Sequence, residues 1–263
     1  MHSHLNGISV HYEISGPSDA PWVVLSNSLM TNFHMWDPQM EALKGYHVLR
    51  YDQRGHGGTE GRDGEYTFEL LAEDALALMD HVGADRVHWV GLSMGGMTGQ
   101  ALTLYHPERI QSLALCDTRG HSPEGREILR LKRIKMIQRK GVEPMVEGCI
   151  RGYFSENFAN ENPTLMDAVR EMVRGTSPLG AIGCSHALSA HNYSPRLHEI
   201  SVPTIIIVGE NDEGTPVWQS EEMLERIPNA RMVVLAEAKH LSNMERVTEF
   251  NDALLGFLRE VEA

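Results

Sequence analysis

A serine lies between two glycines in a segment whose pattern suits nucleophilic catalysis. Residues 91–95 read Gly-Leu-Ser-Met-Gly, directly after the apolar run 87–90, which is typical of a buried strand. Residues 94–105 then have helical spacing without an internal proline. The flanking glycines permit a sharp strand-to-helix turn that strains the serine backbone and exposes its hydroxyl above a sheet. We therefore predict that Ser93 is a nucleophile, and not part of a glycine turn that serves packing alone.

A serine nucleophile needs a base that takes its proton, and the base needs an acidic partner that fixes its tautomer. The sequence contains 14 histidines, and His240 is the predicted base because it lies in the loop after the last predicted strand. Asp117 and Asp212 both follow predicted strands and compete for the acidic role. We favour Asp212, because segment 209–216 forms a loop before a helix. The order serine, aspartate, histidine is also the one expected for such an elbow.

The negative charge that develops on an attacked carbonyl needs hydrogen-bond donors. The predicted donors are the backbone N–H groups of Leu29, which follows a predicted strand, and of Met94, which follows the serine. Asp52 and His56 lie in a glycine-containing turn, 52–57, and we expect them to be structural. Other histidines are expected at the surface, in contact with substrate, or at a frayed terminus, and not at a metal: His121, His186, His191, His198, His2 and His4.

Strands and helices have to alternate along the chain if these residues are to meet. After an N-terminal hairpin around Asn6-Gly7, the predicted strands are 22–25, 46–51, 87–90, 110–116, 204–209 and 231–235. The predicted helices include 67–83, 94–105, 216–226 and 245–260. This alternation requires right-handed crossovers, and it predicts an α/β fold with a mostly parallel central sheet and helices on both faces. The candidate residues all follow strands, where ligands of such sheets bind.

The segment between 120 and 200 interrupts the alternation. It contains no clear buried strand, and it is punctuated by prolines and amphipathic stretches. The clearest stretch is 126–140, where Ile128, Leu131, Ile134 and Ile137 recur at helical spacing and are expected to face inward. We predict a core formed by 1–120 and 200–263, with an inserted helical cap, or lid, at 121–199.

Composition limits the partners. The chain of 263 residues has a formal net charge of -13, which argues against a nucleic-acid partner and against anionic membranes. Its longest wholly apolar run is 205–208, and its first residues resemble no signal peptide, so we expect a cytoplasmic protein. The three cysteines have no paired spacing and suggest neither disulfides nor a zinc site. A small-molecule substrate is expected, and a homo-oligomer is left open.

Several segments together resemble a known family. These are 25–29 with 34–39 (His-Met-Trp-Asp-Pro-Gln), 52–57 (Asp-Gln-Arg-Gly-His-Gly), the elbow 91–96, and 240–245 (His-Leu-Ser-Asn-Met-Glu). The chain resembles an α/β-hydrolase and, more narrowly, is similar to the 3-oxoadipate enol-lactonases of aromatic-compound degradation. It departs from that pattern at Met30 and Lys239, and in the cap at 151–154 and 191–194. These departures leave the exact lactone open.

The resemblance implies hydrolysis of a small enol-lactone or ester that bears a carboxylate. Ser93 would attack the ring carbonyl and form an acyl-enzyme, which a water activated by His240 would release. No cofactor and no metal would be needed. The alternatives are a carboxylesterase, a cofactor-free perhydrolase or haloperoxidase-like enzyme, and a receptor-like binding protein on the same fold.

An anionic substrate would need a cationic partner in the pocket. Seven basic side chains crowd one cap segment: Arg126, Arg130, Lys132, Arg133, Lys135, Arg139 and Lys140. Most are expected to be solvated, but one or two could turn inward and hold a carboxylate, for which the planar guanidinium is better suited. Arg133 is preferred because it lies beside Ile134 and because a similar arginine recurs in lactonase-like caps. Arg151 is second, and Ser28 and Trp36 complete the expected substrate-binding residues.

Overall fold

The computed structural model describes residues 1–263, apart from the side chain of Arg126, and its centre is a sheet of eight strands. The spatial order is β1-β2-β4-β3-β5-β6-β7-β8. Only β1 and β2 run antiparallel to their neighbours, and the other strands are parallel. The strands are β1 (His2–Leu5), β2 (Ile8–Ser15), β3 (Trp22–Ser26), β4 (His47–Tyr51), β5 (Val87–Leu92), β6 (Ile110–Cys116), β7 (Thr204–Gly209) and β8 (Ala230–Leu235). The predicted fold class is confirmed.

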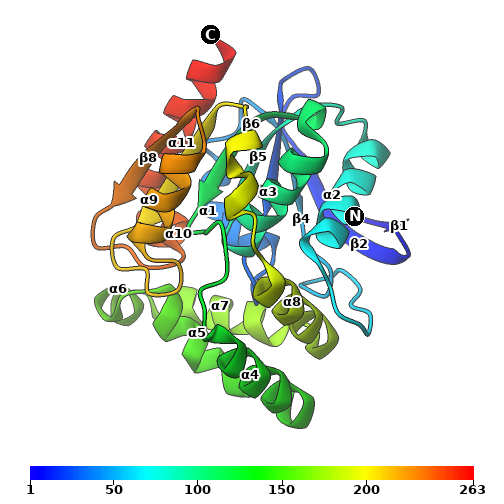
Figure 1. The fold of residues 1–263 in the computed structure, drawn as a ribbon, viewed down its shortest axis with the longest axis vertical. Helices are drawn as coiled ribbons and strands as arrows, with labels where there is room; N and C mark the ends of the chain where they lie inside the picture. The colour runs from blue at the N-terminus through cyan, green and yellow to red at the C-terminus, as the bar shows by residue number, and fades with distance from the viewer.

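Helices cover both faces of this sheet (Figure 1). One face packs on α2 (Phe68–Val82), α3 (Met94–Tyr105) and α9 (Val217–Arg226). The other packs on α1 (Asp37–Met40), α10 (Ser242–Glu245) and α11 (Val247–Glu262). Neighbouring residues of β3 alternate between the two cores, with Val23 and Leu25 in one and Val24 in the other. This alternation follows from the pleat of a strand that is buried on both sides.

Local signals set the ends of α2 as predicted. The Thr67 hydroxyl accepts a hydrogen bond from the Leu70 N–H at 3.1 Å, which satisfies one of the free donors of the first turn. Gly83 ends the helix with a φ of 75°, a left-handed conformation that glycine adopts without steric cost. The helix therefore spans the segment that its two cap residues delimit.

The chain between β6 and β7 is helical. Its helices are α4 (Arg126–Lys140), α5 (Val146–Tyr153), α6 (Glu156–Glu161), α7 (Pro163–Arg174) and α8 (Pro178–Ala190). They gather in a layer at one end of the sheet (Figure 1). Apart from the isolated bridge between His121 and Asn192, no strand pairing occurs among the described residues of this segment. These helices occupy the segment that the sequence suggests is a cap, and its division from the core at 120 and 200 stays a prediction.

The inward face of α4 differs from the predicted one. Ile134 and Ile137 are buried, but Ile128 and Leu131 are 64% and 42% exposed. An i+3 series drifts by about 60° around a helix at each step, so Ile128 lies roughly opposite Ile137. Arg130 and Arg133 take the inward positions instead, in the part of α4 that packs on α8.

Three further observations bear on the chemistry that the chain can perform. Cys116, Cys149 and Cys184 are all buried and free. No group of histidine, cysteine and carboxylate side chains that could hold a metal ion occurs among the described residues. Within the same part of the chain, every helix is too short or too polar to span a bilayer.

Candidate active site

Ser93 occupies a strained turn between β5 and α3. Its φ of 53° and ψ of -110° are values that a residue with a side chain rarely adopts. A Cβ at Gly91 would lie 2.2 Å from the Gly95 carbonyl oxygen, and a Cβ at Gly95 would lie 2.1 Å from the Ser26 carbonyl oxygen. Both positions therefore require glycine, as expected for a turn that pushes one serine out above the sheet.

His240 lies in the loop after β8 and contacts Asp212, which follows β7. The His240 Nδ1 atom is 2.7 Å from Asp212 Oδ2. Asp212 Oδ1 also accepts hydrogen bonds from the N–H groups of Gly214 at 2.7 Å and Thr215 at 3.1 Å, while Oδ2 accepts from the Thr215 hydroxyl at 2.5 Å. These donors hold the carboxylate in place, so that Nδ1 of His240 carries the proton and Nε2 is left to act as a base.

The pKa values distinguish the two carboxylates that compete for the acidic role. Burial opposes the charge of Asp212, but the positive charge and hydrogen bond of His240 outweigh it and hold the pKa of Asp212 at about 2. Burial likewise opposes the charge of His240, yet Asp212 raises the pKa of this imidazole above its ordinary value. For Asp117, burial and the nearby Asp212 charge both act in one direction and raise its pKa to about 8. Asp212 is therefore the ionised partner.

Asp117 lies close to this pair and contacts different groups. Its Oδ1 accepts from the Gly209 N–H at 2.8 Å, and its Oδ2 accepts from the Ser242 hydroxyl at 2.5 Å. No hydrogen bond joins it to His240 among the described residues. Asp117 thus connects the ends of β6 and β7 to the loop that follows His240, while Asp212 contacts the base itself.

The backbone N–H groups of Leu29 and Met94 have fixed orientations. The Ser28 carbonyl accepts from Asn27 Nδ2 at 2.8 Å, from the Thr31 hydroxyl at 2.9 Å and from the Thr31 N–H at 3.3 Å. In a trans peptide the N–H points away from the carbonyl, so the Leu29 N–H lies on the side opposite these donors.

The Ser93 carbonyl is held in the same way as that of Ser28. It accepts from the Thr118 hydroxyl at 2.8 Å and from the Met97 N–H at 3.1 Å, which orients the Met94 N–H. Neither Leu29 nor Met94 uses its N–H in a hydrogen bond to another described residue. Both groups are therefore available to an oxyanion.

A second layer of side chains supports the loop after β3. The Asn27 Oδ1 accepts from the Gln53 N–H at 2.9 Å, and the Asn27 carbonyl accepts from Gln53 Nε2 at 2.6 Å. The Thr98 hydroxyl donates to Gln53 Oε1 at 2.9 Å, which connects the pair to α3. Sequence reasoning placed Asn27 and Gln53 in the family-like segments 25–29 and 52–57 without giving them a supporting role, and it missed Thr98, because each partner is distant along the chain.

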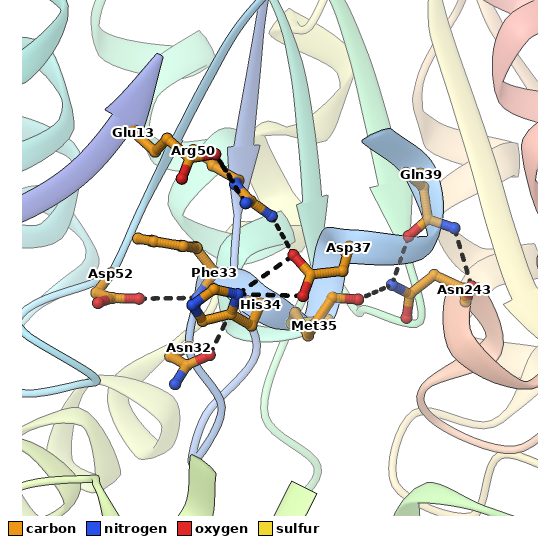
Figure 2. Close-up of polar contacts among 10 residues, drawn as sticks. All are labelled: Glu13, Asn32, Phe33, His34, Met35, Asp37, Gln39, Arg50, Asp52 and Asn243. Carbon is orange, nitrogen blue, oxygen red and sulfur yellow. Dashed lines mark hydrogen bonds and ion pairs between the residues drawn. The ribbon is translucent and has the colours of Figure 1, made fainter. Parts of the chain in front are cut away.

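The segment 34–39 is joined to Asn243 by hydrogen bonds and to Arg50 by an ion pair (Figure 2). The Asn243 side chain donates to the Met35 carbonyl at 2.8 Å and to Gln39 Oε1 at 3.0 Å, and the Asn243 carbonyl accepts from Gln39 Nε2 at 2.9 Å. Arg50 pairs with Asp37 from the far side of the segment. Because Asn243 follows His240 by three residues, this network connects the base loop to the chain that follows the oxyanion loop.

Ser93 and His240 line one cavity of about 340 Å³. Three of the predicted residues line it as well, namely Ser28, Leu29 and Arg133. The core supplies Ser93, His240 and the loop that carries Leu29, while α4 and α5 of the helical layer supply other lining residues. The cavity therefore lies between the core and the helical layer.

Two of the expected substrate-binding residues lie elsewhere. Trp36 is fully buried in the core, where its ring lies 6.1 Å from that of Phe250. Arg151 lies at a separate hollow of about 590 Å³, and Lys239 donates to its carbonyl at 3.0 Å. The structure does not bring either side chain to the cavity that Ser93 lines.

Tyr153 is a functional candidate that sequence reasoning missed. Its hydroxyl donates to the Leu29 carbonyl at 2.6 Å, and its ring stacks on that of His240 with centroids 6.0 Å apart. It is buried, it lines the cavity, and its carbonyl accepts from the Leu241 N–H at 3.1 Å. The signal available in the sequence was the departure from the family pattern at 151–154.

The buried carboxylate of Glu245 adds to the connection between α5 and the His240 loop. It accepts from the Ser155 N–H at 3.0 Å and from the Lys239 N–H at 2.8 Å. With the contacts of Tyr153, these hydrogen bonds hold the end of α5 against the loop that carries the base.

The basic side chains of α4 divide into two groups. Lys132, Lys135, Arg139 and Lys140 are exposed. Arg130 and Arg133 turn inward, and the Arg126 side chain lies outside the described part of the chain. Arg119, which sequence reasoning missed, also lines the cavity and is 7% exposed. Its positive charge counteracts part of the rise in the His240 pKa that Asp212 causes.

The chain is similar in sequence and in structure to known hydrolases. A family model described as alpha/beta hydrolase fold matches residues 21–146. The chain is 31% identical to 3-oxoadipate enol-lactonase 2 of Acinetobacter baylyi, over 94% of this chain and 92% of that one. Its structure is similar to that of the enol-lactonase from Burkholderia xenovorans LB400, with a TM-score of 0.94 and 36% identity over 98% of this chain and 100% of the other. It is also similar to a thermophilic esterase from Thermogutta terrifontis, with a TM-score of 0.93 and 26% identity over 100% and 99%.

Proposed function

The chain belongs to the α/β-hydrolase family and acts on ester or lactone bonds, and from that premise we propose that its substrate is a small carboxylate-bearing enol-lactone. 3-Oxoadipate enol-lactone or a close analogue fits best. The observation that carries the proposal is a cavity that Ser93 and His240 line together with Arg119 and Arg133. The names of the relatives at 31% and 36% identity support the same substrate class.

The first half of the proposed reaction forms an acyl-enzyme. The Ser93 hydroxyl oxygen attacks the ring carbonyl carbon while Nε2 of His240 takes the hydroxyl proton, and the ionised Asp212 stabilises the resulting imidazolium. The N–H groups of Leu29 and Met94 donate to the oxygen that becomes negative. The ring C–O bond then breaks, and the enol oxygen leaves with the proton from His240 while it stays tethered within the acyl group.

The second half releases the product. His240 takes a proton from a water molecule, the hydroxide attacks the ester carbonyl, and Ser93 leaves with the proton that His240 returns. The product is an open-chain acid whose enol tautomerises to the ketone. Neither half requires a group beyond the side chains and backbone donors of the site.

Arg133 is the proposed partner of the substrate carboxylate. It lines the cavity from α4, and no ion pair or hydrogen bond joins it to another described side chain. A planar guanidinium can bind both oxygens of a carboxylate at once. The only carboxylate that lines the cavity among the described residues belongs to Glu213, which is exposed.

Arg133→Ala tests this assignment. We expect the KM for a carboxymethyl enol-lactone to rise about ten-fold or more, since a charged hydrogen bond is lost, while hydrolysis of the uncharged p-nitrophenyl acetate hardly changes. Lys135→Ala is the matched control, because Lys135 is an exposed cation on the same helix. Equal losses on both substrates would mean general damage to the helix, and no loss on either would remove Arg133 from the site.

A panel of lactones and esters tests the reaction itself. We expect the wild type to hydrolyse the carboxylate-bearing enol-lactone with a higher kcat/KM than simple esters or peracid formation, and Ser93→Ala to abolish all three activities. A preference for uncharged esters would identify a carboxylesterase instead. Activity that survives in Ser93→Ala would contradict the acyl-enzyme.

A further inference from the structure

A smaller hollow of about 100 Å³ adjoins the catalytic cavity, and we call it the side compartment. It shares Arg119, Arg133 and Leu188 with the catalytic cavity, so the two hollows meet at these side chains. Beyond them it is lined by Arg130 from α4 and by Ser185 and Ser189 from α8, among others. A substrate arm has to pass these side chains to reach the compartment.

The compartment is strongly cationic. Its lining contains the guanidinium groups of Arg119, Arg130 and Arg133, and no carboxylate lines it among the described residues. Removing such charges from water is costly unless an anion or other acceptors compensate for it. In a chain whose formal net charge is -13, three arginines around one small hollow are not explained by overall charge balance.

Arg130 in particular has an unmet donor. Its Nε atom is buried and has no hydrogen-bond partner among the described residues. Its one ion pair is with Glu127 at 3.4 Å, and the Glu127 side chain is 74% exposed. Exposed pairs of this length contribute little, so Glu127 leaves most of the Arg130 charge uncompensated.

The serines of the compartment do not replace an anion. The Ser185 hydroxyl donates to the Ala181 carbonyl at 2.6 Å, and the Ser189 hydroxyl donates to the Ser185 carbonyl at 3.1 Å. Their protons are therefore engaged within α8. Ser122 also lines the compartment, and the unpartnered Nε of Arg130 is a donor that remains for a bound group.

We propose that the side compartment binds a second carboxylate of the substrate, so that the enzyme prefers enol-lactones with two carboxylates on one arm. The inference rests on the proposed function, since it places the first carboxylate at Arg133. A volume of about 100 Å³ corresponds to roughly three water molecules, which suits a carboxymethyl group. Arg130 pairs with the second carboxylate, and Arg119 and Arg133 lie where the catalytic cavity and the side compartment meet.

Three enol-lactones with the same ring test the proposal. Their arms are a methyl group, a carboxymethyl group and a 1,2-dicarboxyethyl group. For the wild type we expect the KM of the dicarboxylate to be about ten-fold below that of the monocarboxylate. Arg130→Gln is expected to abolish that difference, while Lys135→Gln, which removes an exposed charge from the same helix, keeps it.

The outcomes separate this inference from the proposed function. Equal KM values for the mono- and dicarboxylate on the wild type overturn the side compartment, as does an unchanged ratio in Arg130→Gln. If the methyl lactone were turned over as well as both anionic ones, the proposed function itself would fail.

An inhibition assay avoids the lactones altogether. With p-nitrophenyl acetate as substrate, propane-1,2,3-tricarboxylate is expected to inhibit the wild type about ten-fold more tightly than glutarate. Arg130→Gln is expected to lose this difference while its melting temperature stays near that of the wild type. Inhibition by both acids with equal constants would overturn the proposal.

Discussion

The two walls of the catalytic cavity are built differently. On the sheet side, the groups that the chemistry needs are held by hydrogen bonds: Asp212 contacts His240, Gly214 and Thr215, and the carbonyl of Ser28 accepts three further bonds. On the helical side, Arg133 has no such partner among the described residues. Under the proposed function, the groups that react are held in place before the substrate arrives, whereas Arg133 gains its partner from the substrate.

The largest effect should come from the most constrained residue of the sheet side. Ser93→Ala is expected to lower kcat by roughly four powers of ten or more, because only binding and the oxyanion donors remain. Steady-state assays with the carboxymethyl lactone measure this, and circular dichroism checks that the fold is intact. Retention of more than a tenth of the activity would remove Ser93 from the role of nucleophile.

The two buried carboxylates allow a paired comparison on the same wall. Asp212→Asn is expected to lower kcat by about three to four powers of ten, because the amide no longer fixes the tautomer of His240 or stabilises its charge. Asp117→Asn is expected to lower it only a few-fold, since Asp117 makes no hydrogen bond to His240 among the described contacts. The opposite order in kcat would transfer the acidic role to Asp117.

Tyr153 is the exception on the helical wall, because it is held as firmly as the groups of the sheet side. Tyr153→Phe is expected to lower kcat about ten-fold with little change in KM, since the Leu29 carbonyl loses its donor while the ring keeps its place. Tyr193→Phe is the matched control, because its hydroxyl donates to Glu69 and does not line the cavity. Similar losses in both variants would reduce Tyr153 to a packing residue.

The smallest expected effect is on stability, and it concerns Asp117. Its pKa is raised to about 8, so between about pH 4 and pH 8 the folded chain binds a proton that the unfolded chain lacks. The contribution of this protonated carboxyl to the free energy of unfolding is complete below the pKa of the unfolded chain. It falls as the pH rises and is lost once the pH has passed through 8. The free energy of unfolding of Asp117→Asn, taken relative to that of the wild type, should therefore increase by about 1 kcal/mol or more when the pH is raised from 5 to 8. Urea denaturation of both proteins at pH 5 and pH 8 measures these free energies. The same difference between variant and wild type at both pH values would contradict a raised pKa of Asp117.

The core residues of the candidate site were accessible from the sequence because their signals are local. The turn around Ser93 is predicted by a strand, two glycines and a helix that follow one another within a few residues. Asp212 and His240 follow strands whose apolar runs are easy to recognise, and parallel strands bring their carboxyl ends together. The fold class and these positions therefore follow from short segments read one at a time.

The supporting residues depend on pairings across long stretches of chain. Tyr153 meets Leu29, which lies 124 positions earlier, and no periodicity indicates this contact. Trp36 was expected at the substrate, but it lies in the core, where it packs near Phe250 of α11. On α4, the i+3 series suggested an apolar face at Ile128, while packing against α8 selected the arginine-bearing face.

The hydrogen bonds between α5 and the His240 loop bear on the route by which molecules enter and leave. Tyr153 and Glu245 join the end of α5 to the chain on both sides of the base. An outward movement of α5 would break these hydrogen bonds and would therefore disturb the position of His240. Among the described residues, α4 makes no hydrogen bond to this loop, and it packs on α8, so a movement of α4 would leave the contacts of His240 in place. We therefore expect packing changes under α4 to alter the passage of molecules without altering the acidity of the base.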